Sequence, residues 1–354
     1  MTGLGEGIHT ARIAAGLTQA QLSQRTGVTQ AALSRYENEL REPDPATLAR
    51  LASAIGVNTQ LLTSLSRATG AIATDAHMRR RATAPARAWI RLEARLNVLR
   101  EQLHLLLSSI DYQAPNSLPR LDPLDYLPHE AARLTRAQWR MPQGPVRNLT
   151  AWMESAGCLI IEQDFGTSRV DGLSQWIDRY PVVMINARIP TDRKRFTLAH
   201  ELGHLVMHSE PAHFTEEAEA EAMAFAAVLL MPAHLIRPEL RNRSLGHLAN
   251  LKRKWMVSIA ALIERAHDLG TVSRTSRTSL YKALSAKGWR KREPLSHQLP
   301  PETPSTPTAI VQTFRQLAYN PEQIATFGGF ADAESAAEVL PLYQGLRIVK
   351  PTAN

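Results

Sequence analysis

Residues 195–208 read Arg-Phe-Thr-Leu-Ala-His-Glu-Leu-Gly-His-Leu-Val-Met-His, and they contain the pattern H-E-x-x-H at His200, Glu201 and His204. The stretch reads as one amphipathic helix, in which histidines four residues apart share a face, about 6 Å apart along the axis. Both imidazoles can then bind one Zn²⁺ ion. A carboxylate beside a zinc-bound water can take its proton and deliver it to a leaving amine, which is the role predicted for Glu201. The stretch therefore points to a zinc peptidase site.

A third ligand is needed, because H-E-x-x-H alone arises by chance in helices rich in His and Glu. Residues 216–232 form the candidate element, a strong helix former that a proline ends. On this helix Glu219 shares a face with Ala222, Ala226 and Leu230, and small residues there allow a close approach to the first helix. Glu219 is therefore the predicted third ligand.

Two other glutamates remain as alternatives. Glu221 lies at the other edge of the apolar face and is the second choice, while Glu217 is less favoured. An acidic first turn also suits the helix dipole, so a solvated helix start would explain any one of these side chains by itself. His208 is predicted to support a ligand or end the helix, because a continuous helix holds it about 12 Å from His200 along the axis.

The N-terminal part carries a second pattern. Residues 11–38 have the layout of a helix-turn-helix, in which Thr18 caps the first helix, Gly27 makes the turn and Thr29 caps the second. Further helices near 6–15 and 45–54 would complete a small bundle. The side chains predicted to contact base edges or phosphates are Gln19, Thr29, Gln30, Ser34, Arg35 and Asn38. A helical bundle without a DNA role is the plainer alternative.

Charge is unevenly spread along the chain, whose net charge is +8. Residues 1–65 are formally neutral, whereas residues 66–100 hold eight Arg, including Arg79–Arg81, against two acidic residues. A second basic run covers residues 274–292. Each run is suited to a phosphate backbone, and a solvated face explains each equally well.

The two patterns together resemble one family, the fusions of an XRE-type (Cro/repressor-like) helix-turn-helix with an ImmA/IrrE-type metallopeptidase domain. Further stretches that carry the resemblance are 141–149, 170–176, 181–186, 219–232, 257–266 and 288–290. The resemblance implies His200, His204 and Glu219 as zinc ligands and Glu201 as the catalytic glutamate. Relatives usually have Asn or Asp at the position of Met223, where it can orient a ligand histidine, so the departure predicts a weaker zinc site.

The expected fold is mostly α, with a lambda-repressor-like helical bundle, a linker helix at 86–110 and a small α+β, zincin-like peptidase domain with a short curved sheet. A chain of 354 residues with 44% hydrophobic content can bury two or three such cores. The predicted segments are a DNA-binding domain at 1–65, a basic helical linker at 66–140, the metallopeptidase domain at 141–293 and a Pro-rich tail with a terminal helix at 294–354. Without a signal sequence or a long apolar run, the expected location is the cytoplasm.

Two functions from different classes fit these patterns. The first is a DNA-binding regulator with a zinc endopeptidase that cleaves an XRE-type repressor, or itself, to relieve repression. The second is a non-proteolytic repressor whose peptidase-like domain serves as a metal-binding or ligand-sensing module. In both, the DNA partner is a pseudo-palindromic operator bound by a homodimer, and no membrane is involved. For the enzyme, the strand at 182–186 is the expected edge for an extended substrate.

Overall fold

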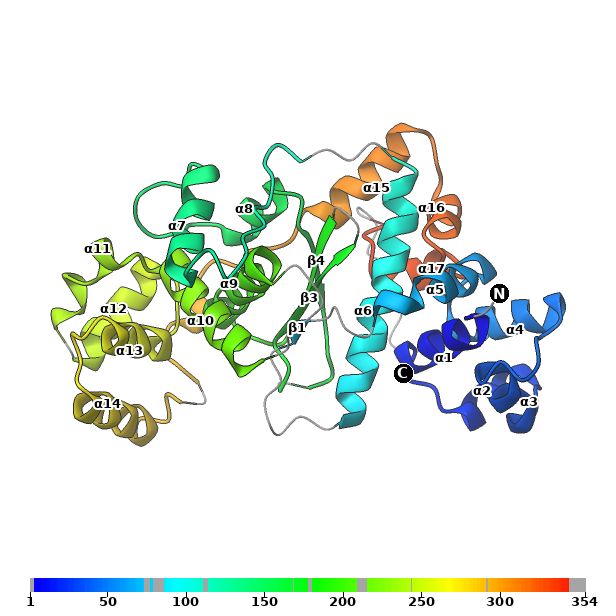
Figure 1. Cartoon of the computed structure of the whole chain (residues 1–354), viewed down its shortest axis with the longest axis horizontal. Coiled ribbons are helices and arrows are strands. Elements are labelled where there is room, and N and C mark those ends of the chain that lie inside the picture. The colour runs from blue at the N-terminus through cyan, green and yellow to red at the C-terminus, as the bar shows by residue number, and fades with distance from the viewer. Residues whose placement is uncertain are drawn as a thin grey trace, which may run out of the picture. The chain divides into compact units, whose positions relative to one another are not determined.

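The computed structural model describes residues 3–72, 77–78, 86–110, 114–167, 169–177, 180–208, 215–242, 244–290 and 292–343. The chain divides into two compact units, each described by itself (Figure 1). The first contains Met1–Ala76, Ala82–Gln113 and Ser305–Asn354, and the second contains His77–Arg81 and Ala114–Pro304. The predicted Arg79–Arg81 cluster lies outside the described residues. Among the residues that are described, no helix is long and apolar enough to cross a membrane.

The first unit begins with a five-helix bundle, as the helix-turn-helix pattern predicts. Its helices are α1 (Leu4–Ala14), α2 (Gln19–Thr26), α3 (Gln30–Glu37), α4 (Pro45–Ile55) and α5 (Thr59–Ile72). Thr18 accepts a hydrogen bond from the Gln21 amide in a capping box, and Gly27 ends α2 at a φ of 72°. The core is apolar, with Ile8, Leu22 and Leu33 fully buried.

Helix α6 (Ala86–Ser108) confirms the predicted linker helix and packs against α1 and α5. Its Ala94 and Val98 belong to the same apolar cluster as the bundle core. Three C-terminal helices complete this unit: α15 (Thr306–Gln316), α16 (Pro321–Phe327) and α17 (Ala333–Ala337). A backbone bond joins the α16–α17 connection to the α4–α5 connection, since the Asn58 amide donates to the Gly329 carbonyl at 2.9 Å.

The second unit is an α+β domain with the small sheet that the sequence predicts. Its sheet has the order β1-β3-β4-β2, from β1 (His77–Met78), β2 (Leu159–Gln163), β3 (Gly172–Ile177) and β4 (Tyr180–Asn186). β4 is parallel to β2 and antiparallel to β3. Four successive residues of β4, 182–185, are buried, as expected of a strand covered on both faces.

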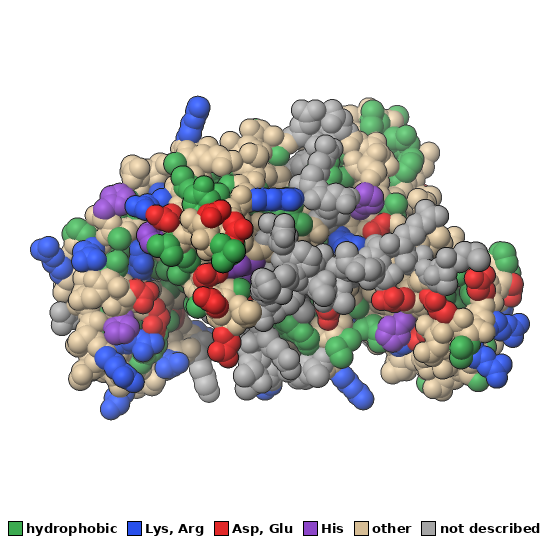
Figure 2. All heavy atoms as spheres, in the orientation of Figure 1, with side chains coloured by type: hydrophobic (Ala, Val, Ile, Leu, Met, Phe, Trp, Pro, Cys, Tyr) green, Lys and Arg blue, Asp and Glu red, His purple; other side chains and the backbone are tan. Residues whose placement is uncertain are grey.

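Helix α9 (Thr191–Met207) lies against one face of the sheet, where Val183 and Ile185 share a core with Leu198 and Leu202. The helices that follow are α10 (Glu216–Leu230), α11 (Ala233–Ile236), α12 (Leu245–Trp255), α13 (Ile259–Asp268) and α14 (Arg274–Ala286), while α7 (Pro128–Gln138) and α8 (Leu149–Ser155) precede the sheet. Single 3-10 turns lie at Glu239–Arg241 and Ser296–Gln298. Figure 2 shows the face of the molecule that is turned to the viewer, with Lys and Arg side chains spread over the part where α12–α14 lie. This distribution is consistent with the basic run at 274–292.

The predicted substrate edge is corrected by the sheet order. β4, which contains residues 182–186, pairs on both sides and therefore has no open edge. β3 is paired with β4 on one side and with the two residues of β1 on the other, where His77 lies opposite Ser174 and Met78 opposite Leu173. The sequence shows that residues 182–185 are apolar, but it does not show which strand lies between two others.

The observed units also differ from the predicted linear segments. The predicted linker, 66–140, contributes to both units, and the predicted tail, 294–354, is divided at 304/305. Burial explains the difference. Phe314 and Ile324 are fully buried in the first unit, and Glu302 is held in the second by an ion pair with the buried Arg195.

Candidate metal centre and nucleic-acid interface

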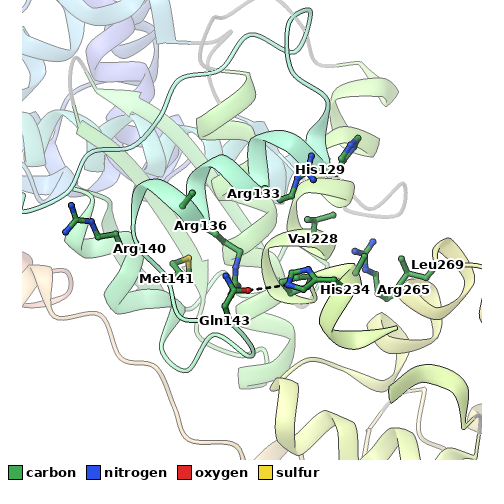
Figure 3. A pocket seen from close by; sticks show the side chains of 13 residues that line it. His129, Arg133, Arg136, Arg140, Met141, Gln143, Val228, His234, Arg265 and Leu269 are labelled. Atoms are coloured by element: carbon green, nitrogen blue, oxygen red, sulfur yellow. Dashed lines mark hydrogen bonds between the residues drawn. The ribbon is translucent and has the colours of Figure 1, made fainter. Parts of the chain in front are cut away.

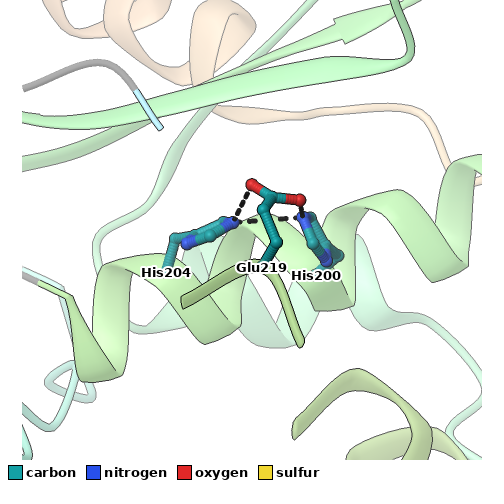
Figure 4. Close-up of side chains that lie close together, drawn as sticks. All are labelled: His200, His204 and Glu219. Carbon is teal, nitrogen blue, oxygen red and sulfur yellow. Dashed lines mark hydrogen bonds and ion pairs between the residues drawn. The ribbon is translucent and has the colours of Figure 1, made fainter. Parts of the chain in front are cut away.

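Three predicted ligands meet between α9 and α10. The Nε2 atoms of His200 and His204 are 3.1 Å apart, and the carboxylate oxygens of Glu219 lie 3.4 and 3.2 Å from them (Figure 4). One donor atom from each residue falls within 4.8 Å of the others. Zinc bonds of about 2.0–2.2 Å to imidazole and carboxylate fit such a spacing. The donor atoms of these three residues therefore fit the Zn²⁺ ion that the sequence pattern predicts.

Electrostatics within the cluster favour an ionised carboxylate. Burial by itself raises the pKa of Glu219, but the hydrogen bonds from His200 and His204, with their positive charge, outweigh it and hold that pKa well below its usual range. Both histidines are almost completely buried. A buried pair of imidazoles facing an anionic oxygen pair is a suitable set of donors for a divalent transition metal.

Small residues at the helix crossing bring the ligands together. A β-carbon on Gly203 would lie 3.1 Å from the Ala222 Cα and 3.2 Å from the Phe225 ring, so α9 and α10 approach very closely at this point. Thr215 caps the start of α10 by accepting from the Ala218 amide at 3.1 Å. The small Ala222 on the Glu219 face thus allows the close approach of the two helices, as predicted. The prediction did not include Gly203, the small residue on α9 that faces it.

Glu201 lies under β3. Its carboxylate accepts a hydrogen bond of 2.7 Å from the hydroxyl of Ser174, and both side chains are fully buried. Gly172 permits the strand to lie this close, since a β-carbon there would meet Thr197 at 2.8 Å. The sequence patterns did not by themselves assign a role to Ser174. Its place in the stretch 170–176 was the available signal for a functional residue.

Two further residues form a chain of hydrogen bonds behind His204. The Nδ1 atoms of His204 and His208 are 3.2 Å apart, and His208 Nε2 lies 2.8 Å from a Glu221 carboxylate oxygen. If His204 presents Nε2 to a metal, its Nδ1–H donates to His208, whose Nε2–H then donates to Glu221. The structure thus places Glu221, the second choice as ligand, in contact with His208 instead of within the metal cluster.

This chain of bonds bears on the departure at Met223. Met223 lines a cavity of about 960 Å³ with Phe196 and Ala220, and offers no hydrogen-bond partner to a histidine. His208 and Glu221 give His204 a chain of hydrogen bonds that can orient its ring. The weaker zinc binding expected from Met223 stays a prediction.

We expect His208→Ala to weaken zinc binding by about ten- to a hundredfold, because His204 loses the partner that fixes its tautomer and ring orientation. Competition with a chromophoric chelator would measure the zinc dissociation constant. The exposed His297 provides the control, since His297→Ala removes a histidine far from the site in sequence. Equal zinc affinity in the two variants would contradict the orienting role.

The second predicted site lies on α3. Gln30 and Arg35 are exposed and Ser34 is half-buried, while Thr29 is exposed and caps the helix by accepting from the Ala32 amide at 3.2 Å. Asn38 ends the helix, where its Nδ2 donates to the Ser34 carbonyl at 2.7 Å. The start of α3 therefore presents polar side chains to solvent, as a recognition helix requires.

Gln19 is partly committed inside the bundle. Its Nε2 donates to Glu37 at 2.9 Å, and Glu37 also binds the Arg12 guanidinium and His9. Burial raises the pKa of Glu37, but the bonds from His9, Arg12 and Gln19 lower it to about 2. This buried ion pair fixes α1, α2 and α3 to one another, so a phosphate contact by Gln19 would compete with a structural bond.

Comparison with known families assigns both regions. Residues 8–62 match a family model described as helix-turn-helix, and residues 153–267 match a peptidase family model described as IrrE N-terminal-like domain. The second match contains the whole α9–α10 site. Comparison with curated proteins gives no match.

Proposed function

We propose, on the premise that this chain is a fusion of a helix-turn-helix domain with an IrrE N-terminal-like peptidase domain, that it is a DNA-binding regulator carrying a zinc-dependent endopeptidase. The inferred substrate is a repressor of the XRE type or the chain itself, and cleavage would relieve repression. The inferred DNA contacts are those of Thr29, Gln30, Ser34, Arg35 and Asn38, with Gln19 nearby.

One observation carries the enzymatic part. Glu201 is buried beside the His200–His204–Glu219 cluster without being one of its three members. A structural zinc site is usually closed by four side chains, whereas a catalytic site keeps one position open for water or substrate. Zinc, when bound, would supply Lewis-acid polarisation of a peptide carbonyl and a water of lowered pKa. A three-ligand cluster with an adjacent carboxylate therefore supports hydrolysis.

The chain's own residues account for the proton transfers. Glu201 takes a proton from the attacking water as the oxygen forms a bond to the carbonyl carbon, and it gives a proton to the amide nitrogen as the C–N bond breaks. One water is consumed, and the products are a carboxylate and an amine. The Ser174 hydroxyl, 2.7 Å from the Glu201 carboxylate, fixes the orientation of that carboxylate throughout.

Strand pairing supports an extended polypeptide as substrate. β1 pairs antiparallel with β3, and His77 lies opposite Ser174, the residue that touches Glu201. The same edge of β3 would suit the backbone of a substrate strand. Since residues 77–78 lie between α5 and α6 in the chain, cleavage of the chain itself at this point would cut the covalent link between the bundle and α6, two parts that pack in one unit.

The test is the zinc content of wild type, Glu219→Ala, Glu221→Ala and Glu217→Ala, each then incubated with candidate repressors and alone. We expect about one equivalent of zinc and cleavage in wild type, and loss of both in Glu219→Ala, because a site reduced to two histidines binds weakly. Glu221→Ala should retain zinc at saturating concentration. Glu217→Ala, exposed on the same helix, serves as the control.

Two results would overturn parts of the proposal. If zinc is lost in Glu221→Ala and kept in Glu219→Ala, the third ligand is Glu221 and not Glu219. Bound zinc without cleavage of any candidate protein would favour the non-proteolytic regulator, in which the metal only stabilises a conformation.

A further inference from the structure

A second cavity, separate from the metal cluster, lies where α7 meets the end of α10 and the side of α13. Its volume is about 770 Å³, within the range of sites that hold small molecules. Figure 3 shows Arg133 and Arg265 near Val228, with His234 bonded to Gln143. Apolar side chains line part of the wall, namely Met141, Val228, Leu269, Ala137, Pro232 and Ala233.

The charged lining is of one sign. It contains Arg133, Arg136, Arg140 and Arg265 with two histidines, and no acidic residue. Within the described part of the chain, none of these four arginines makes an ion pair with a carboxylate. Asp268 interacts with Arg265 through space, but it lines the neighbouring cavity. The pocket therefore has an excess of positive charge.

Two of the arginines have a structural role that explains their burial. Arg136 donates to the Leu229 carbonyl at 2.7 Å, and Arg265 donates to the Met231 carbonyl at 3.1 Å. Both cations thus cap the C-terminus of α10, where the helix dipole favours positive charge. Among the described residues, the acceptors of their side-chain hydrogen bonds are carbonyl oxygens, which carry no formal charge to neutralise the two guanidinium groups.

The remaining cations have no such explanation. The side chains of Arg133 and Arg140 are exposed, and neither guanidinium makes a hydrogen bond with a described residue. Figure 3 shows Arg140 extending away from the other cations. Arg133 lies one turn before Arg136 on α7, so its charge adds to that of the two buried guanidinium groups. A cluster of three guanidinium groups beside an apolar wall is suited to an anionic head with an apolar body.

We propose that this pocket, at the α7–α10–α13 junction, binds a small organic anion, a carboxylate or phosphate attached to an apolar group. A concave site of this volume fits a small molecule better than the phosphate backbone of duplex DNA, which requires cations on an exposed surface. Anion binding in this pocket does not depend on the proposed peptidase activity. It lies at the opposite end of α10 from Glu219, so a ligand would contact the residues that cap the helix carrying the third proposed zinc ligand.

Calorimetric titration of the full-length protein with octanoate and with phenyl phosphate tests the site, and octanol is the uncharged control. We expect at least one anion to bind at one equivalent, and the preferred anion to identify the head group. Arg133→Gln should weaken binding by about tenfold or more, because it removes a charge-assisted hydrogen bond. Arg274→Gln, an exposed arginine on α14, should leave binding unchanged.

Three results would overturn the inference. They are no binding of either anion, binding of octanol as tight as that of octanoate, and equal affinity in wild type and Arg133→Gln. A duplex of about 20 base pairs that displaces the bound anion, and whose own affinity falls in Arg133→Gln, would instead assign the pocket to nucleic-acid contact.

Discussion

Glu201→Gln should reduce peptide hydrolysis by about a hundred- to ten-thousandfold while leaving the zinc content unchanged. The amide keeps the size of the carboxylate and an oxygen that accepts from Ser174, but it cannot take a proton from water at neutral pH. None of the three proposed ligands is altered. The loss is therefore expected in the catalytic rate and not in metal binding or folding.

The measurement is single-turnover cleavage of a candidate repressor, followed by mass spectrometry, with elemental analysis of the same samples. Operator binding by the variant is expected to equal that of wild type, since α3 is far from Glu201 in the chain and lies in the other unit. In cells the variant should no longer relieve repression. If Glu201→Gln still relieves repression as wild type does, hydrolysis is not needed for the function, and the protein is a non-proteolytic regulator.

Glu302→Ala is expected to lower the free energy of unfolding by about 3–5 kcal/mol, because it leaves a buried guanidinium without its counter-ion. Arg195 is fully buried, and burial lowers its pKa to about 10. Its guanidinium pairs with Glu302 and also donates to the Met256 carbonyl at 3.0 Å. The second Glu302 oxygen accepts from the Thr150 amide at 3.1 Å, at the start of α8.

Chemical denaturation of wild type and variant would measure this loss. The matched control is Glu239→Ala, because Glu239 pairs at 2.9 Å with Lys254, whose side chain is 54% exposed. Removing an exposed pair costs at most about 1 kcal/mol. A similar small cost for Glu302→Ala would mean that the ion pair with Arg195 does not anchor residues 294–304, as expected of a Pro-rich tail.

Residues of the same charge that lie two positions apart have different roles in this chain. Glu219 joins the histidine cluster, whereas Glu221, two residues later, binds His208. Arg193 pairs with Asp171 at the surface of a cavity, and Arg195, two residues later, pairs with Glu302 in the core. Helical periodicity separates such neighbours onto different faces, but only the packing of those faces decides what each one meets.

The sequence by itself was enough to predict the helix-turn-helix, the linker helix and the meeting of His200, His204 and Glu219. H-E-x-x-H fixes two histidines on one helical face, and the small residues after Glu219 fix the face that α10 presents, because both follow from the 3.6-residue repeat. The caps at Thr18 and Thr29 and the turn at Gly27 are likewise local, so the helix-turn-helix could be predicted without tertiary information.

Tertiary structure alone decided which distant segments meet. That Ser174 lies on Glu201, that β4 is enclosed while β3 pairs with β1, and that Glu302 reaches Arg195 all depend on contacts between residues far apart in the chain. The apolar pattern of a strand specifies burial but not its neighbours, and a charged side chain does not specify its partner. Such pairings are fixed by the packing of the whole unit, where most buried polar groups find a partner.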